Sequence, residues 1–356
     1  MKKNEPSRRL FIKDTAAILG LSGLIVPGCG RKKADKVDEY QVLTDSTNKI
    51  DKLLDTDSGS HALINRQGCE VIGFRVTDPA TGAEIPLLWY DSCIDKPESG
   101  WGGHATVMFP CVGGIKYGVT RVGDKVIRLD GHGFARTSMF EIVETGKQED
   151  AHIRYRMIHT PEIRENFPFD FELELTYALK GNSLSITFEV TNTGTETMFC
   201  GFGWHPGLRA PVVPGKGSKA DCRLVMPEGG SITRFGVNDK CQLTGENLQL
   251  GTDRPIRRTE EELDATMLFQ VDNPALRSLT LEDPASGIDL RVDFRDFSHF
   301  GLWSEPEKEY ICIEPSMGFD DSVDQEPFDQ KVGVVKIEPR GKDIRSATIT
   351  ASFKRT

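Results

Sequence analysis

Residues 171–190 read FELELTYALKGNSLSITFEV, and this stretch decides the fold class. Apolar side chains occupy every second position on both sides of the pair Gly181-Asn182. Such alternation gives an extended strand one buried face and one solvated face, and glycine tolerates the positive φ of a tight turn. The stretch therefore predicts a β-hairpin with one face in a core.

The same period of two recurs along most of the chain. Further alternating runs lie at residues 70–77, 125–129, 153–158, 277–281, 289–294, 332–338 and 345–353. The 35 glycines and 19 prolines separate such runs and do not gather in blocks. One short helix is expected, at residues 259–264, and strands do not alternate with helices. Many half-buried strands predict an all-β domain built as a large antiparallel β-sandwich.

The first 29 residues predict export. Residues 7–13 (SRRLFIK) match a twin-arginine signal around Arg8 and Arg9, and the apolar run at 16–26 is too short to span a bilayer. Cys29 ends a lipobox-like sequence, whose cysteine becomes acylated. The alternative is plain cleavage, with Cys29 lost or free. We expect a periplasmic or cell-envelope protein whose membrane contact is a lipid anchor at Cys29.

The net charge disfavours nucleic acid and anionic lipid as partners. The chain has a formal net charge of −10, and the leader contributes +3, so its removal leaves −13. An acidic exported protein is a poor match for nucleic acid or for anionic lipid. Residues 30–60 are rich in Lys, Asp, Ser and Thr and predict a solvated tether, which leaves residues 61–356 as the folded domain.

Two further expectations concern that domain. Residues 206–258 are rich in glycine, proline and charge, and they predict a long excursion at the rim of the core. Twin-arginine export carries folded proteins, so the domain should fold without relying on disulfides. Three cysteines inside apolar strand patterns, Cys111, Cys200 and Cys312, are expected to be small buried side chains.

Candidate chemistry begins with one histidine and one glutamate. His205 precedes Pro206, which holds it extended, and Trp204 beside it offers a ring on which a sugar could stack. Taken alone, such a histidine is more often a packed residue at a strand end. Glu314 ends the apolar run 310–313, where a carboxylate is costly to bury unless it is solvated or paired. An acid, a base and a polar anchor for a sugar-sized ligand could come from such groups.

His132 supplies the third group. Gly131 and Gly133 flank it and allow the backbone to approach a ligand closely, although a turn carrying a surface histidine would have the same sequence. Arg136 could hydrogen-bond sugar hydroxyls or pair with an acid. The acids of residues 320–324 lack the remainder of a calcium loop, and no Cys-x-x-Cys pair is present. We therefore expect neither a metal nor a cofactor.

These stretches resemble the aldose 1-epimerase (galactose mutarotase-like) family, in particular its exported bacterial branch of epimerase-like proteins. The resemblance runs from about residue 63 to residue 353, with the blocks in the same order. The blocks are residues 109–113, 132–136, 169–173, 203–206, 301–303 and 312–315. The resemblance implies a β-supersandwich with a sugar cleft across one concave sheet.

The resemblance also implies roles. Glu314 corresponds to the general base, His205 to the general acid and His132 to a group that binds the sugar ring. The family also uses an arginine and an aspartate, for which Arg66 and Asp264 are the nearest matches. Two departures stand out: Gly207-Leu208 replaces the aromatic residue common after the His-Pro pair, and residues 207–258 form a longer segment than usual.

The expected reaction interconverts the α and β anomers of a free sugar or sugar acid. Glu314 would take the proton of the anomeric hydroxyl while His205 protonates the ring oxygen, which opens the ring. His132, His205 and Glu314 are therefore expected to line one cleft, with room for a pyranose between His205 and Glu314. One alternative is a non-catalytic carbohydrate-binding protein on the same scaffold, because a fold does not determine a function. Another is a polysaccharide lyase or hydrolase, although no tyrosine is placed as a lyase base and no second carboxylate is paired with Glu314.

Overall fold

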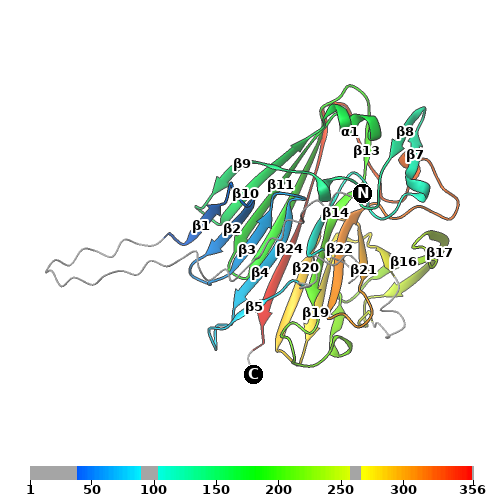
Figure 1. Cartoon of the computed structure of the whole chain (residues 1–356). Coiled ribbons are helices and arrows are strands. Elements are labelled where there is room, and N and C mark those ends of the chain that lie inside the picture. The colour runs from blue at the N-terminus through cyan, green and yellow to red at the C-terminus, as the bar shows by residue number, and fades with distance from the viewer. Residues whose placement is uncertain (1–37, 90–102, 257–265, 355–356) are drawn as a thin grey trace, which may run out of the picture. The chain divides into compact units, whose positions relative to one another are not determined.

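The computed structural model describes residues 38–89, 103–256 and 266–354. Antiparallel strands dominate these ranges and form three large sheets, as Figure 1 shows. The predicted all-β class is therefore confirmed. None of the helices in the described ranges is both long enough and apolar enough to cross a membrane. The helix expected at residues 259–264 and the predicted site residues Asp264 and Cys29 lie outside these ranges.

The largest sheet contains the hairpin predicted from residues 171–190. Its eight strands have the order β15-β19-β20-β24-β12-β11-β10-β9. Strands β11 and β12 pair from Lys180↔Ser183 outward, and along β11 buried and half-buried residues alternate. The strands are β9 (Glu141–Gly146), β10 (Ala151–Ile158), β11 (Phe171–Lys180), β12 (Ser183–Asn192), β15 (Arg223–Val225), β19 (Ser278–Asp283), β20 (Ile288–Asp293) and β24 (Lys342–Phe353).

A seven-stranded sheet contains the candidate residues His205 and Glu314. Its order is β17-β16-β18-β21-β22-β14-β6, and all its pairs are antiparallel. The strands are β6 (Ala105–Met108), β14 (Phe202–Arg209), β16 (Ser231–Val237), β17 (Leu243–Gly251), β18 (Met267–Gln270), β21 (His299–Trp303) and β22 (Tyr310–Met317).

The third sheet corrects the predicted tether. It has the order β1-β2-β3-β4-β5, and the first two strands fall within residues 30–60. Asp51 of β2 is fully buried and binds Arg66 through two hydrogen bonds of 2.8 and 2.9 Å. The acids of this segment were expected to be solvated, but Asp51 is buried and paired. The strands are β1 (Tyr40–Thr44), β2 (Ile50–Asp55), β3 (His61–Asn65), β4 (Glu70–Thr77) and β5 (Glu84–Pro86).

Aromatic contacts define the core between the sheets. Phe188 of β12 lies 5.6 Å from Phe202 of β14, and Tyr177 of β11 lies 6.4 Å from Trp204, as ring-centroid distances. On the other flank the Tyr155 hydroxyl of β10 donates to Asp51 of β2 at 2.9 Å. The eight-stranded sheet thus forms one layer, and the seven- and five-stranded sheets pack against it.

Small elements complete the described chain. Helix α1 (Pro161–Asn166) was not expected from periodicity, but its start is signalled by Thr160, whose Oγ1 accepts from the Ile163 N–H at 3.3 Å, and by proline at its first position. The other elements are β7 (Val119–Val122) paired with β8 (Lys125–Arg128), β13 (Met198–Cys200) paired with β23 (Val335–Ile337), and the 3₁₀ turns η3 (Lys116–Gly118), η4 (Ala135–Thr137), η5 (Lys219–Asp221), η7 (Pro274–Leu276) and η8 (Phe328–Gln330).

The segment 206–258 adds strands at the edges of two sheets. Strand β15 is the edge of the eight-stranded sheet, and β16 and β17 end the seven-stranded sheet. The excursion expected here is therefore hydrogen-bonded into both layers. The three cysteines expected to be buried are at most 2 % exposed, and the six cysteines of the described ranges are free thiols.

Candidate functional site

Strand register brings His205 and Glu314 to one face of the seven-stranded sheet. Gly203 pairs with Ser316 and Gly207 pairs with Cys312, so His205 on β14 lies beside Glu314 on β22. Their side chains meet, with Nε2 of His205 3.3 Å from Oε1 of Glu314. Both residues are buried, at 5 % and 8 % exposure. A histidine and a carboxylate in contact can exchange a proton with each other and with a bound ligand.

Glycine makes room for this carboxylate. Gly301 on β21 is the cross-strand partner of Glu314. A Cβ placed on Gly301 would lie 3.2 Å from Oε2 of Glu314, closer than an ordinary van der Waals contact. Gly203 and Gly207 likewise carry no side chain on the same face of β14. Three positions next to His205 and Glu314 therefore have no side chain on this face, and a ligand could approach the backbone there.

His132 reaches the pair from a loop. Its φ of 63° lies in the left-handed region, which is uncommon for a residue other than glycine. The N–H of Gly113 donates to Nδ1 of His132 at 3.2 Å, so that nitrogen is unprotonated and Nε2 carries the hydrogen. The rings of His132 and His205 are 5.5 Å apart and nearly perpendicular. His132 is thus a fixed hydrogen-bond donor beside His205.

Burial controls the charge of both histidines. Desolvation and, to a smaller extent, the neighbouring His132 lower the pKa of His205 to about 3. Desolvation and the charge of Arg136 lower the pKa of His132 to about 4. Burial therefore disfavours an isolated positive charge on either ring. The Trp303 ring, 5.8 Å from that of His205, forms an adjacent apolar wall.

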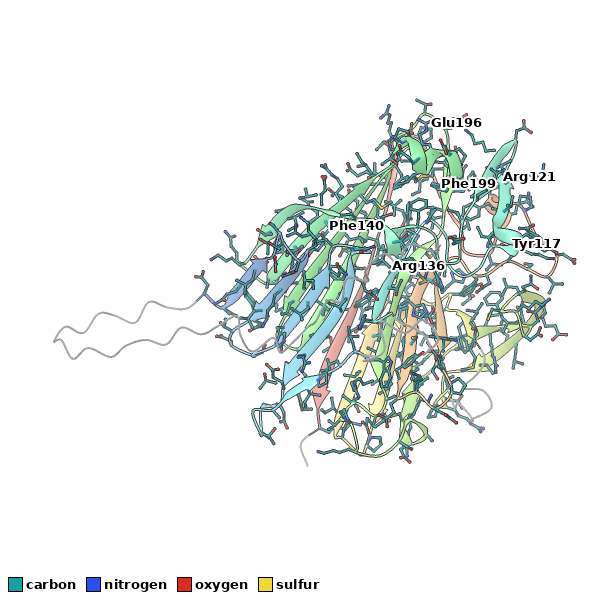
Figure 2. All side chains as sticks on the ribbon, in the orientation of Figure 1. Tyr117, Arg121, Arg136, Phe140, Glu196 and Phe199 are labelled. Atoms are coloured by element: carbon teal, nitrogen blue, oxygen red, sulfur yellow. The ribbon has the colours of Figure 1, made fainter. Side chains whose placement is uncertain are left out.

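The structure places the other predicted site residues in different environments. Arg136 is exposed on η4 (Figure 2), at the end of the loop that carries His132. Arg66 is engaged by the buried Asp51, so we assign it to the ion pair and not to a ligand site. Trp204 is fully buried, and its Nε1 donates to the Ala105 carbonyl at 3.2 Å. The prediction that Trp204 stacks on a sugar is wrong, because neighbours in a strand point to opposite faces and His205 occupies the other face.

One geometric expectation is corrected. His132, His205 and Glu314 were expected to line one cleft, with room for a pyranose between His205 and Glu314. The three do converge, but the 3.3 Å contact leaves no such room between His205 and Glu314. A sugar ring must either lie over the pair or separate it.

Sequence reasoning missed His299. It stands on β21 on the same face as Gly301 and Trp303, and its ring lies 5.0 Å from that of Phe319. Burial, with the charges of Arg277 and Arg345, lowers its pKa to about 4. The alternation His299-Gly301-Trp303 along the strand could have placed it on this face.

Cys312 also borders the pair. Its Sγ, Nε2 or Nδ1 of His205 and a carboxylate oxygen of Glu314 all lie within 4.8 Å of one another. These three donors could hold a metal ion.

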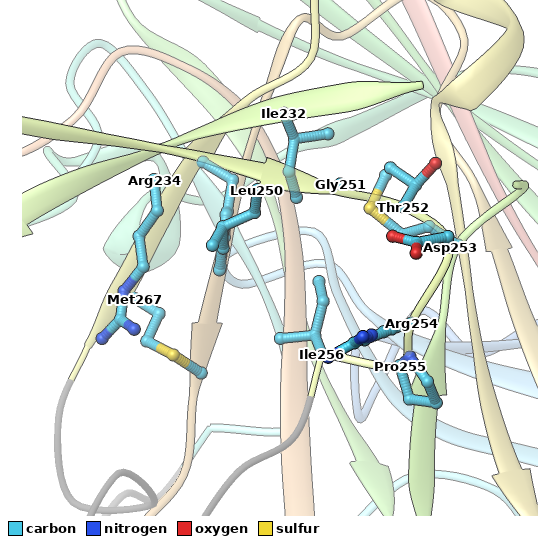
Figure 3. Close-up of a pocket in the computed structure, with 12 residues that line it drawn as sticks. Ile232, Arg234, Leu250, Gly251, Thr252, Asp253, Arg254, Pro255, Ile256 and Met267 are labelled. Carbon is cyan, nitrogen blue, oxygen red and sulfur yellow. The ribbon is translucent and has the colours of Figure 1, made fainter. Parts of the chain in front are cut away.

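A separate pocket of about 450 Å³ opens on the other face of the sheet (Figure 3). Its lining includes Met267 and Phe269, which pair with Leu302 and Phe300 on the face away from Glu314. The pocket is therefore distinct from the histidine–glutamate site.

Comparisons with known proteins identify relatives of this chain by sequence and by fold. The sequence profile of the family described as "Aldose 1-epimerase" matches residues 52–339. Protein LacX (chromosomal) of Lactococcus lactis subsp. lactis is 31% identical over 297 residues, which cover 79% of this chain and 94% of LacX. A galactose mutarotase related enzyme from Lactobacillus acidophilus aligns with a TM-score of 0.73 at 26% identity and covers 88% of this chain and 98% of its own.

A second solved structure shows the fold alone. It is a galactose mutarotase-like protein from Lactobacillus casei, with a TM-score of 0.71 at 23% identity and coverage of 88% and 100%. The match to the family profile spans most of the chain, and LacX is similar over nearly its whole length. The chain therefore belongs to the aldose 1-epimerase family.

Proposed function

We propose that this protein interconverts the α and β anomers of a free aldose or uronate by acid–base opening of the sugar ring. The observation that supports the proposal is the buried contact of His205 with Glu314 on a glycine-lined sheet face, with His132 beside it. Membership of the aldose 1-epimerase family supports a sugar epimerase activity in general terms.

The reaction moves one proton in each direction. Glu314 accepts the proton of the anomeric hydroxyl while His205 donates a proton to the ring oxygen, so the C1–O5 bond breaks and an aldehyde forms. Rotation about the C1–C2 bond exposes the other carbonyl face. Reversal of both transfers then closes the ring as the other anomer.

Burial makes the pair suitable for this exchange. A lone charge on His205 is costly, which is why its pKa falls to about 3. The reactive pair is an imidazolium beside a carboxylate, and after both transfers it is an imidazole beside a carboxylic acid. Both forms carry zero net charge, so the reaction never leaves a single unpaired charge in the buried site.

The other residues bind and orient the sugar. His132 presents an Nε2–H fixed by the Gly113 N–H and is suited to a ring hydroxyl or the ring oxygen. Trp303 offers an apolar ring next to His205, on which sugar C–H groups could pack.

The decisive test replaces Glu314 by glutamine. This change keeps the side-chain size but removes the base, so anomer exchange measured by NMR should fall by about two orders of magnitude or more. Sugar affinity, measured by calorimetry, should change little, because the lost interaction belongs to the transition state. His132→Ala should weaken binding more than turnover.

Glu162→Gln, an exposed change on α1, is the matched control and should leave both quantities unchanged. If the wild-type protein binds sugars from a broad panel of aldoses and uronates without exceeding the spontaneous exchange rate, the enzymatic proposal is wrong. The protein would then be a carbohydrate-binding member of the family.

A further inference from the structure

We propose that His205, Cys312 and Glu314 form a binding site for a single Zn²⁺ ion, and that this ion competes with the sugar for the acid–base pair. The binding itself is independent of the proposed function. The competition rests on that function, because it assumes that His205 and Glu314 act on a sugar.

The three donors come from two neighbouring strands. Cys312 and Glu314 are two residues apart on β22 and so project from the same face, and His205 projects beside them from β14. One donor atom from each residue lies within 4.8 Å of the other two. Glycine stands beside each β22 donor, since Gly207 pairs with Cys312 and Gly301 pairs with Glu314. Cys312 therefore has glycine on its β14 side and Trp303 on its β21 side, and Glu314 has glycine on its β21 side and His205 on its β14 side.

The distances suit zinc. With Zn–N and Zn–O bonds of about 2.0–2.1 Å, two ligands of a tetrahedral ion are about 3.3 Å apart. Nε2 of His205 and Oε1 of Glu314 already have a separation of 3.3 Å. The longer Zn–S bond of about 2.3 Å lets Cys312 join after a small side-chain adjustment. Calcium and magnesium are disfavoured, because they require mostly oxygen ligands in larger coordination shells.

Charge favours the ion as well. Zn²⁺ with one thiolate and one carboxylate is neutral overall, which a buried site tolerates. His205 contributes an uncharged nitrogen, because a metal ion displaces any proton from the imidazole nitrogen that it binds. Binding releases the thiol proton of Cys312 to solvent, together with the proton that His205 and Glu314 share. No electron is transferred, and the ion leaves when a chelator removes it.

The consequence follows from the shared atoms. A zinc ion that occupies Nε2 of His205 and a carboxylate oxygen of Glu314 blocks the proton donor and the proton acceptor together. Anomer exchange should therefore be inhibited reversibly, and raising the sugar concentration should reduce the inhibition.

The test uses the full chain, reduced and freed of metal. Calorimetry with Zn²⁺ alone should show about one equivalent bound to the wild-type protein, with proton release visible as a dependence of the heat on the buffer. Co²⁺ should give the near-ultraviolet absorption band of a cobalt–thiolate bond. Cys312→Ser and Cys312→Ala should each weaken Zn²⁺ binding at least about tenfold and abolish the band.

Cys200→Ser is the matched control, because Cys200 is equally buried but lies on β13. It should bind Zn²⁺ as the wild-type protein does. Unchanged Zn²⁺ affinity in both Cys312 variants overturns the proposal, as does failure of the wild-type protein to bind Zn²⁺. If neither Cys312 variant folds, the cobalt spectrum of the wild-type protein decides, and absence of the thiolate band counts against the site.

The two proposals can fail separately. Zinc binding is measured without sugar, so a protein that binds Zn²⁺ at Cys312 but exchanges no anomers refutes the proposed function and leaves the metal site standing. A protein that exchanges anomers with equal rates in the presence and absence of Zn²⁺ refutes the competition alone. Each variant is compared with itself with and without the ion, which cancels any change in its basal rate.

Discussion

A missing side chain at Gly301 gives Glu314 its position. The carboxylate lies over the glycine, and a methyl group there would lie 3.2 Å from Oε2. Gly301→Ala should therefore displace Glu314 from His205 and slow anomer exchange by about tenfold, since catalytic geometry tolerates only small displacements. Because Gly301 is not in the left-handed region, alanine fits its backbone and the protein should fold normally.

The control is Gly73→Ala on β4. A Cβ at that position would lie 3.6 Å from Leu63, an ordinary contact. Exchange rates measured by NMR should be unchanged in this variant. Equal rates for Gly301→Ala and the wild-type protein would show that the close approach at Gly301 does not position Glu314.

For individual residues, the sequence predicted the central site residues better than the residues that surround them. His205, Glu314 and His132 were predicted to converge, because a polar group at the end of an apolar strand or between glycines needs a reason to be there. Trp204 was misassigned although the period of two excludes it from the face of His205. Other contacts depend on loop conformation and strand register, which the sequence pattern does not reveal. One example is the Gly113 N–H that fixes the tautomer of His132.

At the scale of elements, buried Asp51 forms an ion pair within the five-stranded sheet and a hydrogen bond to the eight-stranded sheet. Asp51 accepts two hydrogen bonds from Arg66 and one from Tyr155 of β10. Asp51→Asn should cost about 3–5 kcal/mol of unfolding free energy, because it leaves the Arg66 charge without its partner. Urea denaturation followed by fluorescence measures this loss.

The pair of Arg75 and Glu84 provides the comparison. Its atoms are 3.9 Å apart, and its side chains are 46% and 57% exposed. Glu84→Gln should change the unfolding free energy by less than about 1 kcal/mol. If Asp51→Asn and Glu84→Gln lost the same unfolding free energy, the buried ion pair would not stabilise the protein more than the exposed one.

Elements were predicted well where alternation was long and poorly where composition was the guide. The hairpin at residues 171–190 and strand β4 were predicted from their periodicity. Residues 40–55 were taken for tether because their acids and lysines suggested solvation, whereas Asp51 is a fully buried partner. Helix α1 is too short for a period of 3.6 to show, so only its cap could reveal it.

For the molecule as a whole, buried histidines predict sensitivity to acid. Burial lowers the pKa values of His132 and His299 to about 4, from 6.5 in an unfolded chain. Between these values the unfolded chain binds more protons than the folded one, so stability is lost as the pH falls below about 6.5. Asp320 acts in the opposite direction, because burial raises its pKa to about 6.

The two histidines together outweigh Asp320, so the melting temperature should decrease between about pH 7.5 and about pH 5. Calorimetric melts at both values measure the effect. His299→Gln should reduce the pH dependence, since glutamine cannot be protonated. A melting temperature that is constant or rises on acidification would contradict the expectation.

We also propose that the protein is exported by the twin-arginine route and anchored by lipid. The proposal rests on Arg8, Arg9 and Cys29, which lie outside the described residues. Replacing both arginines by lysine should retain the protein in the cytoplasm, and Cys29→Ser should release it from the membrane fraction. Cell fractionation with immunoblotting measures both. Unchanged fractionation in the first variant refutes the route, and in the second it refutes the anchor.

The position of β24 has a consequence for biosynthesis. Residues 342–353 lie between β12 and β20, in the interior of the eight-stranded sheet, although they come after all the other strands in the chain. Until the ribosome has synthesised them, this sheet consists of two unconnected halves with unpaired edges, which are prone to aggregation. Folding of this layer must therefore wait until translation is nearly finished, and a nascent chain would need protection by chaperones until then.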